Sequence, residues 1–366
     1  MMKWIFLLPT ICVCPLVADE STASEGQKEK TVLEDRIQRL EQDVGLEVAP
    51  KKTTVFLSGQ FIYWKTSLDG VAYATTAEVV SVPGGGTIND EFKTRTVHFD
   101  YDPAFQIGVG LGLPHDFWDL SLAWLHSNTK GHDTAHGTLS ATPGNRVILD
   151  QIGLIEQLDS PPSIAKADCK VHLDIVDAVL GRTFLWSRYF IFRPFAGLRG
   201  AWLSLDWDIS YKMPIRIPSP TVQSYTKFDV DNDYSAYGFV GGFDAKWNFY
   251  KELGVFSHAS ASLVYGESTE KTKQKFYRIP ANQTATAEQT LKAHNSTHAV
   301  KGIFDIALGL KWEIDFYKTN RLLMWIGYDF FYWPNVTQKT INQQTRSRDR
   351  ADLSYQGLIA GAKVIF

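Results

Sequence analysis

Large apolar residues alternate with small or polar residues along most of the chain. In residues 106–113 and again in 118–124, every second residue is large and apolar, and the residues between them are Gly, Ala or polar. Similar patterns return in 192–202, 239–247 and 304–312. A period of two with one apolar face predicts a β-strand, so these segments indicate a fold built from successive strands.

The segments between the predicted strands are of two lengths. Short turns occur near 114–117, 186–188, 250–252 and 317–320, and the opposite strand ends carry long polar stretches such as 131–168 and 267–300. Short turns on one side and long loops on the other are typical of outer-membrane barrels, in which a lipid-facing series alternates with a lumen-facing series.

The alternation places about ten strands with clear limits. They lie at roughly 54–64, 97–113, 117–126, 169–182, 189–209, 235–249, 254–266, 301–316, 321–333 and 352–366. The stretch from Val71 to Val97 leaves room for a further hairpin. With both termini in the periplasm, the strand number must be even. We predict an all-β fold, an antiparallel transmembrane β-barrel of the outer-membrane type with an even number of about 10–16 strands and a short N-terminal helix.

The last nine residues form an alternating strand that ends on an aromatic residue. Its apolar series is Leu358, Ala360, Ala362, Val364 and Phe366, and the other series contains Gly357, Gly361 and Lys363. In a closed barrel this strand must pair with the first one, near Val55 to Tyr63, which leaves no edge exposed. The ending resembles the signal by which bacterial outer-membrane barrels are recognised by the barrel-assembly machinery, and the assembly-signal residues are Gly361, Val364 and Phe366.

Composition narrows the class of protein. Aromatic residues make up 13% of the chain, charged residues 21%, and the mean hydropathy is -0.16. These values exclude a polytopic helical membrane protein, whereas a barrel conceals its hydrophobicity in alternation. The formal net charge of -3 gives no reason to expect a nucleic-acid partner.

The first 18 residues are typical of a secretory signal peptide. Lys3 supplies the positive start, Trp4 to Val13 is an apolar run, and Leu16 to Ala18 offers a small residue before Asp19. Cleavage there leaves Cys169 as the single cysteine, which can form no internal disulfide, and its role stays open.

Residues 19–52 are predicted to form a separate periplasmic segment and linker, and the barrel is predicted to occupy 53–366. Four apolar residues in the segment are spaced four, three and four apart, which is heptad spacing; they are Leu33, Ile37, Leu40 and Val44. A helix this short would gain stability by self-association. A single amphipathic helix on the barrel or a linker is the alternative.

Charged residues inside the predicted strands indicate a lumen, because water tolerates them and lipid does not. The predicted pore-lining residues are Arg182, Arg193, Arg199, Asp244, Lys246, Asp305, Lys311 and Glu313. Acidic and basic groups facing each other across a constriction would select solutes by charge and size. The alternative is that these charges pair and plug a narrow barrel. Asp177 stands on the apolar parity, so the register of its strand stays open.

Tryptophans near the predicted strand ends are placed as membrane-interface girdles would be. They are Trp64, Trp118, Trp124, Trp186, Trp202, Trp247, Trp312 and Trp333. A stack that binds sugars is the alternative interpretation.

No motif of a catalytic or metal site is present. His132 and His136 have the spacing of a metal pair on a helix, but they fall in a predicted loop without a completing ligand, so no metal or cofactor is expected. His126 to Asn128 contains the residue types of an outer-membrane lipase, yet successive strand residues face opposite sides. We therefore expect no enzyme; an outer-membrane enzyme is the rival of a different class.

Several strings in order resemble the major outer membrane protein family of Legionella and chlamydia-related bacteria. They include Tyr63 to Lys65 with Gly70 to Ala74, Trp118 to Leu120, Leu180 to Phe184, Arg193 to Trp202, Leu263 to Gly266, Leu308 to Trp312 and Leu353 to Leu358. The resemblance implies a porin-like outer-membrane barrel and transfers no catalytic site. The chlamydial members are rich in cross-linked cysteines, whereas here Cys169 alone remains, so a disulfide-linked scaffold is not expected.

These observations together predict a function at the cell surface. We expect a passive channel for small hydrophilic solutes and ions in the bacterial outer membrane, with long loops extracellular and both termini periplasmic. The alternative is a surface-exposed structural protein or adhesin. Outer-membrane lipid, the assembly machinery and small solutes are the expected partners.

Overall fold

The computed structural model describes ten stretches of the chain. They are residues 53–82, 86–114, 116–137, 146–150, 162–214, 223–250, 252–279, 286–316, 320–340 and 348–366. The predicted signal peptide, the predicted N-terminal helix and its residues Leu33, Ile37, Leu40 and Val44 lie outside these stretches.

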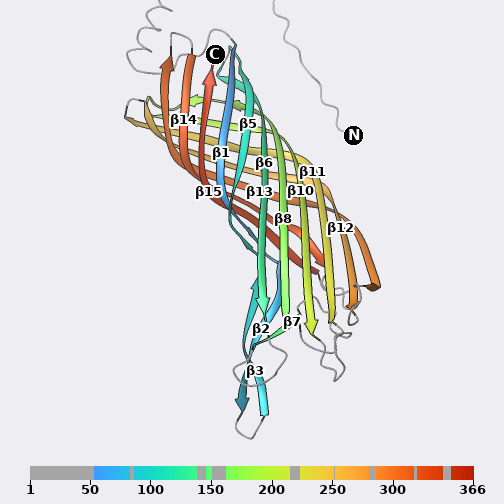
Figure 1. Ribbon diagram of the computed structural model, residues 1–366. Coiled ribbons are helices and arrows are strands. Elements are labelled where there is room, and N and C mark those ends of the chain that lie inside the picture. Colours follow the sequence, from blue (N-terminus) through green and yellow to red (C-terminus); the bar gives the residue numbers. More distant parts are fainter. Residues whose placement is uncertain are drawn as a thin grey trace, which may run out of the picture. The chain divides into compact units, whose positions relative to one another are not determined.

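The described strands form a closed antiparallel barrel of ten strands, which confirms the predicted fold class. Their order around the ring is β1 (Thr54–Leu68), β5 (Tyr101–Gly112), β6 (Trp118–His136), β8 (Ile164–Arg182), β10 (Phe190–Pro214), β11 (Gln223–Tyr250), β12 (Leu253–Ile279), β13 (Thr286–Phe316), β14 (Asn320–Thr340) and β15 (Arg348–Ile365) (Figure 1). Two short strands, β4 (His98–Phe99) and β9 (Phe184–Leu185), pair with β6 and β10.

The ring closes between its last and first strands, as the terminal alternation predicts. The register of β1 and β15 runs from Phe56 opposite Ile365 to Leu68 opposite Leu353. Beyond it, the backbone N–H of Phe366 donates to the carbonyl of Val55 at 2.9 Å. Every strand of the ring therefore has two neighbours, and the sheet exposes no edge there.

A small second sheet lies at one end of the barrel, at the bottom of Figure 1. It has the order β3 (Gly86–Thr96), β2 (Ala72–Val82) and β7 (Arg146–Asp150), so the room for a hairpin after Val71 is filled. The hydroxyl of Tyr73 donates to Asp133 Oδ2 at 2.9 Å, and the hydroxyl of Tyr211 donates to the carbonyl of Tyr73. These bonds anchor the small sheet to β6 and β10.

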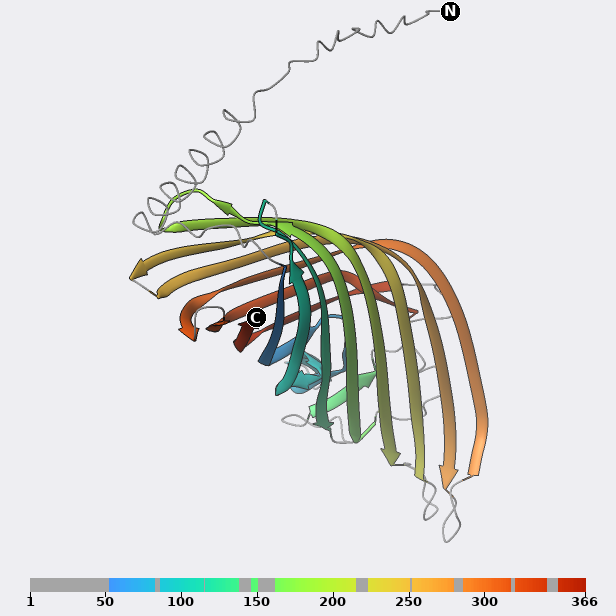
Figure 2. The ribbon, with the colours of Figure 1, turned by 90° about the horizontal axis from the view of Figure 1, so that it is seen from above.

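The long polar stretches contain much more strand than the sequence predicts. β12 and β13 pair from Leu253 opposite Trp312 to Arg278 opposite Thr286, so most of 267–300 is sheet and not loop. Figure 2 shows that these long strands extend beyond the ends of the other strands of the ring. We refer to the end that carries these extensions as the long-strand end and to the opposite end as the short-turn end.

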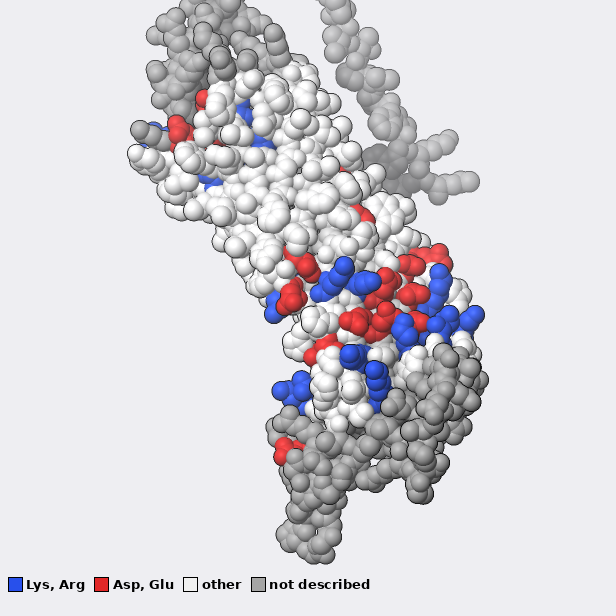
Figure 3. All heavy atoms as spheres, viewed as in Figure 1, with Lys and Arg blue, Asp and Glu red and all other residues white. Residues whose placement is uncertain are grey.

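The outer face of the barrel carries a broad apolar band. Large apolar side chains are exposed on every strand of the ring from β5 to β14, on alternate residues in most of them; examples are Ile107, Leu122, Phe239 and Leu308. Figure 3 shows an uncharged surface across the middle of the barrel and a mixed belt of acidic and basic residues beyond it. Partly exposed charges on these strands also pair: Lys227 Nζ of β11 lies 3.2 Å from Asp208 Oδ1 of β10 and 2.8 Å from Asp229 Oδ1 on its own strand. An apolar band bounded by charge is the outer surface expected of a barrel in lipid.

Within the described residues, no helix combines the length and the apolar character needed to cross a bilayer.

Candidate functional site

The candidate site is a network of charged side chains inside the barrel near its short-turn end. Seven of the eight predicted pore-lining residues share the parity of buried inward residues. Arg193 and Arg199 share it with Ala201, Asp244 and Lys246 with Ala236, and Asp305, Lys311 and Glu313 with Ile303. The structure therefore places these seven charges on the inner face.

Arg182 is the exception, and the prediction that it lines the lumen is wrong. In β8, Leu173 and Ile175 are buried, and Leu180, on the parity of Arg182, is exposed. The guanidinium of Arg182 lies outside, 5.6 Å from the Trp118 ring centroid and 5.0 Å from that of Phe184. Between Asp177 and the long-strand end, the inner face of β8 is apolar. The apolar series of this strand therefore does not identify its lipid-facing side.

Arg193 forms the centre of the first charge cluster. Its Nε donates to Asp119 Oδ2 at 2.7 Å, its Nη2 also bonds Asp119, and its Nη1 donates to Asp244 Oδ2 at 2.6 Å. His258 Nδ1 lies 2.6 Å from the other oxygen of Asp244. The side chains come from β6, β10, β11 and β12, so the cluster ties four strands together inside the barrel.

A second pair lies further along the same inner face. Arg199 donates from Nε and Nη2 to the two carboxylate oxygens of Asp177, both at 2.7 Å, and from Nη1 to Ser262 Oγ at 3.3 Å. Such fork-to-carboxylate geometry is the strongest form of this ion pair. Only 5% of the Arg199 side chain and 18% of the Asp177 side chain are exposed. The residue that the sequence left unassigned is thus the partner of a predicted one.

The third group consists of three lysines and one glutamate. Lys246 forms an ion pair with Glu313, and Lys311 Nζ lies 3.9 Å from the same carboxylate. Lys363, on the inward series of β15, lies with its Nζ 3.6 Å from the centroid of the Phe56 ring. Charges of both signs are present inside the barrel, but they face one another in pairs and not as two opposed rings.

Toward the long-strand end, the side chains inside the barrel are mostly apolar; the buried Lys301, over the Tyr234 ring, and Ser127, bonded by Trp64 Nε1, lie among them. One continuous cluster of buried residues receives members from all ten strands of the ring. Tyr234 of β11 and Trp333 of β14 meet with ring centroids 5.4 Å apart, although β12 and β13 separate their strands. Trp64 stacks on Tyr355 at 4.4 Å. We call this cluster the apolar layer.

The predicted tryptophan girdle divides into two sets. Trp124, Trp186, Trp247 and Trp312 are exposed on the outer surface, and Trp118 and Trp202 share the outward parity of their strands. Trp64 and Trp333 are 1% and 0% exposed and belong to the apolar layer, so their assignment to the membrane interface is wrong. A tryptophan near a strand end fits either face when the interior is also apolar.

Gly361 of the predicted assembly signal has a packing role in the barrel. A Cβ at this position would lie 2.4 Å from the Trp325 ring, whose Nε1 donates to Gln60 Oε1 at 2.8 Å. We expect Gly361→Ala to destabilise the barrel by about 1–3 kcal/mol, because the ring must leave its place. Gly59 offers a matched control, since a Cβ there meets nothing within 4 Å.

Urea unfolding of both refolded variants, followed by tryptophan fluorescence, checks this expectation. Gly59→Ala should unfold at or slightly above the wild-type urea concentration. Equal stability of the two variants would show that Trp325 does not need the space beside Gly361.

Several residues of the network were not predicted as site residues. Asp119 and His258 stand on the inward parity of β6 and β12, and this parity is the signal that could have found them. His132 and His136 lie in strand β6 and not in a loop. Another set, His126, His172 and Asp174, converges on the outer face, where one ligand atom from each residue lies within 4.8 Å of the others.

Comparison with known proteins identifies the family. No curated protein sequence matches the chain. The outer membrane protease OmpT of Escherichia coli is 9% identical, with 88% of this chain and 98% of that chain covered and a TM-score of 0.37. A Pseudomonas aeruginosa FadL homologue is 10% identical over 86% and 90% of the two chains, with a TM-score of 0.27. The Pseudomonas putida toluene transporter TodX is 9% identical over the same shares, with a TM-score of 0.25.

The structural similarities are too low to support any statement about activity. The sequence profile is informative, because the profile described as "Legionella pneumophila major outer membrane protein precursor" matches residues 48–366, which is the whole barrel. The resemblance suggested by the ordered strings is thereby confirmed. The chain belongs to this family of outer membrane proteins, and its barrel lies in the outer membrane.

Proposed function

We propose that this protein is a structural barrel of the outer membrane whose interior is closed. It displays an ordered protein surface at its long-strand end, and it is not an enzyme. The apolar layer carries the proposal, because all ten strands contribute buried side chains to it. Water does not wet a constriction lined by apolar groups, so such a layer blocks the passage of ions and hydrophilic solutes. This is the structural alternative considered from the sequence.

The charged network supports the same function. Arg193 and Arg199 are held by carboxylates from other strands, and Lys246 by Glu313. Paired charges with bidentate geometry make strong contacts between nearby strands on the inner face and leave little field for selecting solutes. They stabilise the narrow ring from within.

For the orientation, we propose that the short turns and both termini face the periplasm and that the long-strand end faces the cell exterior. Outer-membrane barrels carry their short turns on the periplasmic side. The exposed aromatics then form two interface girdles, with Trp118, Trp247 and Trp312 near the periplasmic side and Trp124 and Trp202 near the outer side. Gly361, Val364 and Phe366 remain the proposed assembly signal.

The second candidate function is a channel for small hydrophilic solutes that is shut in this conformation. The observation that favours it is that inward charges of both signs, including Lys311 and Asp305, lie between the apolar layer and the short-turn end. In this case the apolar layer is the gate, and conduction requires that its side chains move apart.

Surface labelling of intact cells tests the proposed display. An epitope inserted between Val82 and Gly86, in the β2–β3 hairpin, is expected to bind antibody without permeabilisation. The same epitope inserted between Trp186 and Arg188, in a short turn, should bind antibody only after the outer membrane is opened. Labelling of the short turn in intact cells would contradict the orientation.

A further inference from the structure

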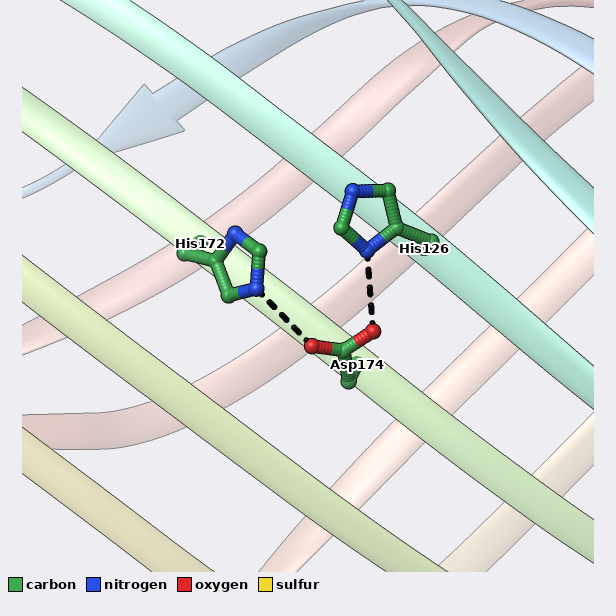
Figure 4. Close-up of side chains that lie close together, drawn as sticks. All are labelled: His126, His172 and Asp174. Carbon is green, nitrogen blue, oxygen red and sulfur yellow. Dashed lines mark hydrogen bonds and ion pairs between the residues drawn. The ribbon is translucent and has the colours of Figure 1, made fainter.

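Three side chains on the outer face of β6 and β8 converge at one point, outside the charged network (Figure 4). His126 Nδ1 lies 2.9 Å from Asp174 Oδ1, and His172 Nε2 lies 2.9 Å from Asp174 Oδ2. The two imidazole rings meet edge to face with centroids 4.9 Å apart. Two imidazole nitrogens and a carboxylate thus surround the same small volume.

The backbone fixes this arrangement. His126 and Asp174 are direct partners in the β6–β8 register, and His172 precedes Asp174 by two residues, on the same face of β8. Side chains at such positions have Cβ atoms about 4.5–5.5 Å apart across the strands. Both strands have hydrogen-bonded neighbours on either side, so the three residues are held on a rigid surface.

Neighbouring aromatic residues support the cluster. Trp124 Nε1 donates to Asp174 Oδ1 at 3.0 Å, and the Phe105 ring lies with its centroid 5.2 Å from that of His126. A hydrogen bond from a neighbour that orients a ligating carboxylate is typical of metal sites in proteins. The side chains of His126, His172 and Asp174 remain 28%, 46% and 23% exposed, so an ion from solution can reach them.

We propose that His126, His172 and Asp174 bind a divalent transition-metal ion, Zn²⁺ in the first place, on the outer surface of the barrel. Imidazole nitrogen favours zinc, copper and nickel, whereas magnesium and calcium favour sites made only of oxygen. Zinc lies about 2.0–2.1 Å from nitrogen ligands and about 2.0–2.2 Å from carboxylate ligands, so small side-chain rotations bring all three atoms onto one ion. Water fills the remaining position.

The same two strands provide a matched control. His132 of β6 lies opposite Asp168 of β8 and opposite His98 of β4, with all three side chains exposed. The residue types match those of the proposed site. Nevertheless, the single convergent group found in the described part of the chain is that of His126, His172 and Asp174.

Isothermal titration of the refolded full-length barrel with zinc chloride tests the proposal. We expect one ion per chain, loss of this binding in His126→Ala, His172→Ala and Asp174→Asn, and unchanged binding in His132→Ala. Trp124→Phe should weaken binding about 10–100-fold, because the carboxylate loses the partner that orients it.

The visible spectrum of bound Co²⁺ supplies a second readout that depends on the ligands themselves. The wild-type spectrum should be that of nitrogen and oxygen ligands and should disappear in His126→Ala. Zinc binding that survives in all three ligand variants, or that is lost equally in His132→Ala, would overturn the proposal. A cluster that serves only as a pair of histidine–aspartate bridges gives no stoichiometric binding in the wild type, which also overturns it.

Discussion

Replacement of Arg199 by alanine is expected to lower the free energy of unfolding by about 3–5 kcal/mol, since it leaves the Asp177 carboxylate inside the barrel without its partner. Arg199 is among the most enclosed charged side chains of the described residues, with both fork nitrogens on Asp177 and a third contact to Ser262. Urea unfolding of refolded protein in detergent, monitored by tryptophan fluorescence, measures the loss.

Two further variants separate the pair from general damage. Arg182→Ala removes an arginine that lies outside on Trp118 and Phe184, and it should cost less than about 1 kcal/mol. Arg199→Met combined with Asp177→Leu should recover much of the lost stability, because no unpaired charge remains. Equal effects of Arg199→Ala and Arg182→Ala would show that the interior pair does not stabilise the barrel.

The ring of strands was predictable because the apolar band imposes a strict period of two. Leu358 to Phe366 and the hairpin around residues 114–117 show the pattern at its clearest, and both lie in the barrel wall. The inward position of Arg193 and Lys246 follows from the same parity. Where one face meets lipid and the other is polar, alternation identifies both faces.

The prediction fails where the interior is itself apolar. In β8 the inward Leu173 and Ile175 are as hydrophobic as the outward Leu180, so the parity places Arg182 on the wrong face and leaves the face of Asp177 undecided. For the same reason Trp64 and Trp333 could be read as interface residues. Their burial depends on residues from strands that are far away in the sequence, such as Tyr234 and Tyr355.

The cluster of His126, His172 and Asp174 and the strand extensions could not be predicted from the sequence, for a different reason. His126 meets Asp174 only through the β6–β8 register, and no pattern in the chain sets that register across the long polar stretch between them. The extensions of β12 and β13 leave the apolar band, so their outward residues are polar and the period of two disappears. A segment in which both alternating series are polar shows no period of two, and such a segment is predicted to be a loop.

Serine at both Trp64 and Trp333 is expected to turn a silent barrel into a conducting one. Both indoles are fully buried in the apolar layer, one on Tyr355 and the other against Tyr234. Their removal leaves a gap, and the two hydroxyls give water polar partners there, whereas a purely apolar gap would stay dry. Single-channel recording in planar bilayers should show no steps for the wild type and resolved steps for the double variant.

The comparison decides between the two candidate functions, provided that each sample is folded. Removal of a buried aromatic costs about 3–5 kcal/mol, so each variant is first checked for the altered gel mobility of an unheated, folded barrel. Trp247→Ser, on the outer surface, is the control for removal of an indole and should stay silent. Conductance steps in the wild type would contradict a closed interior and support the channel. A folded double variant without steps would place the barrier elsewhere, at the paired charges around Arg193, because apolar side chains would then not be what excludes water.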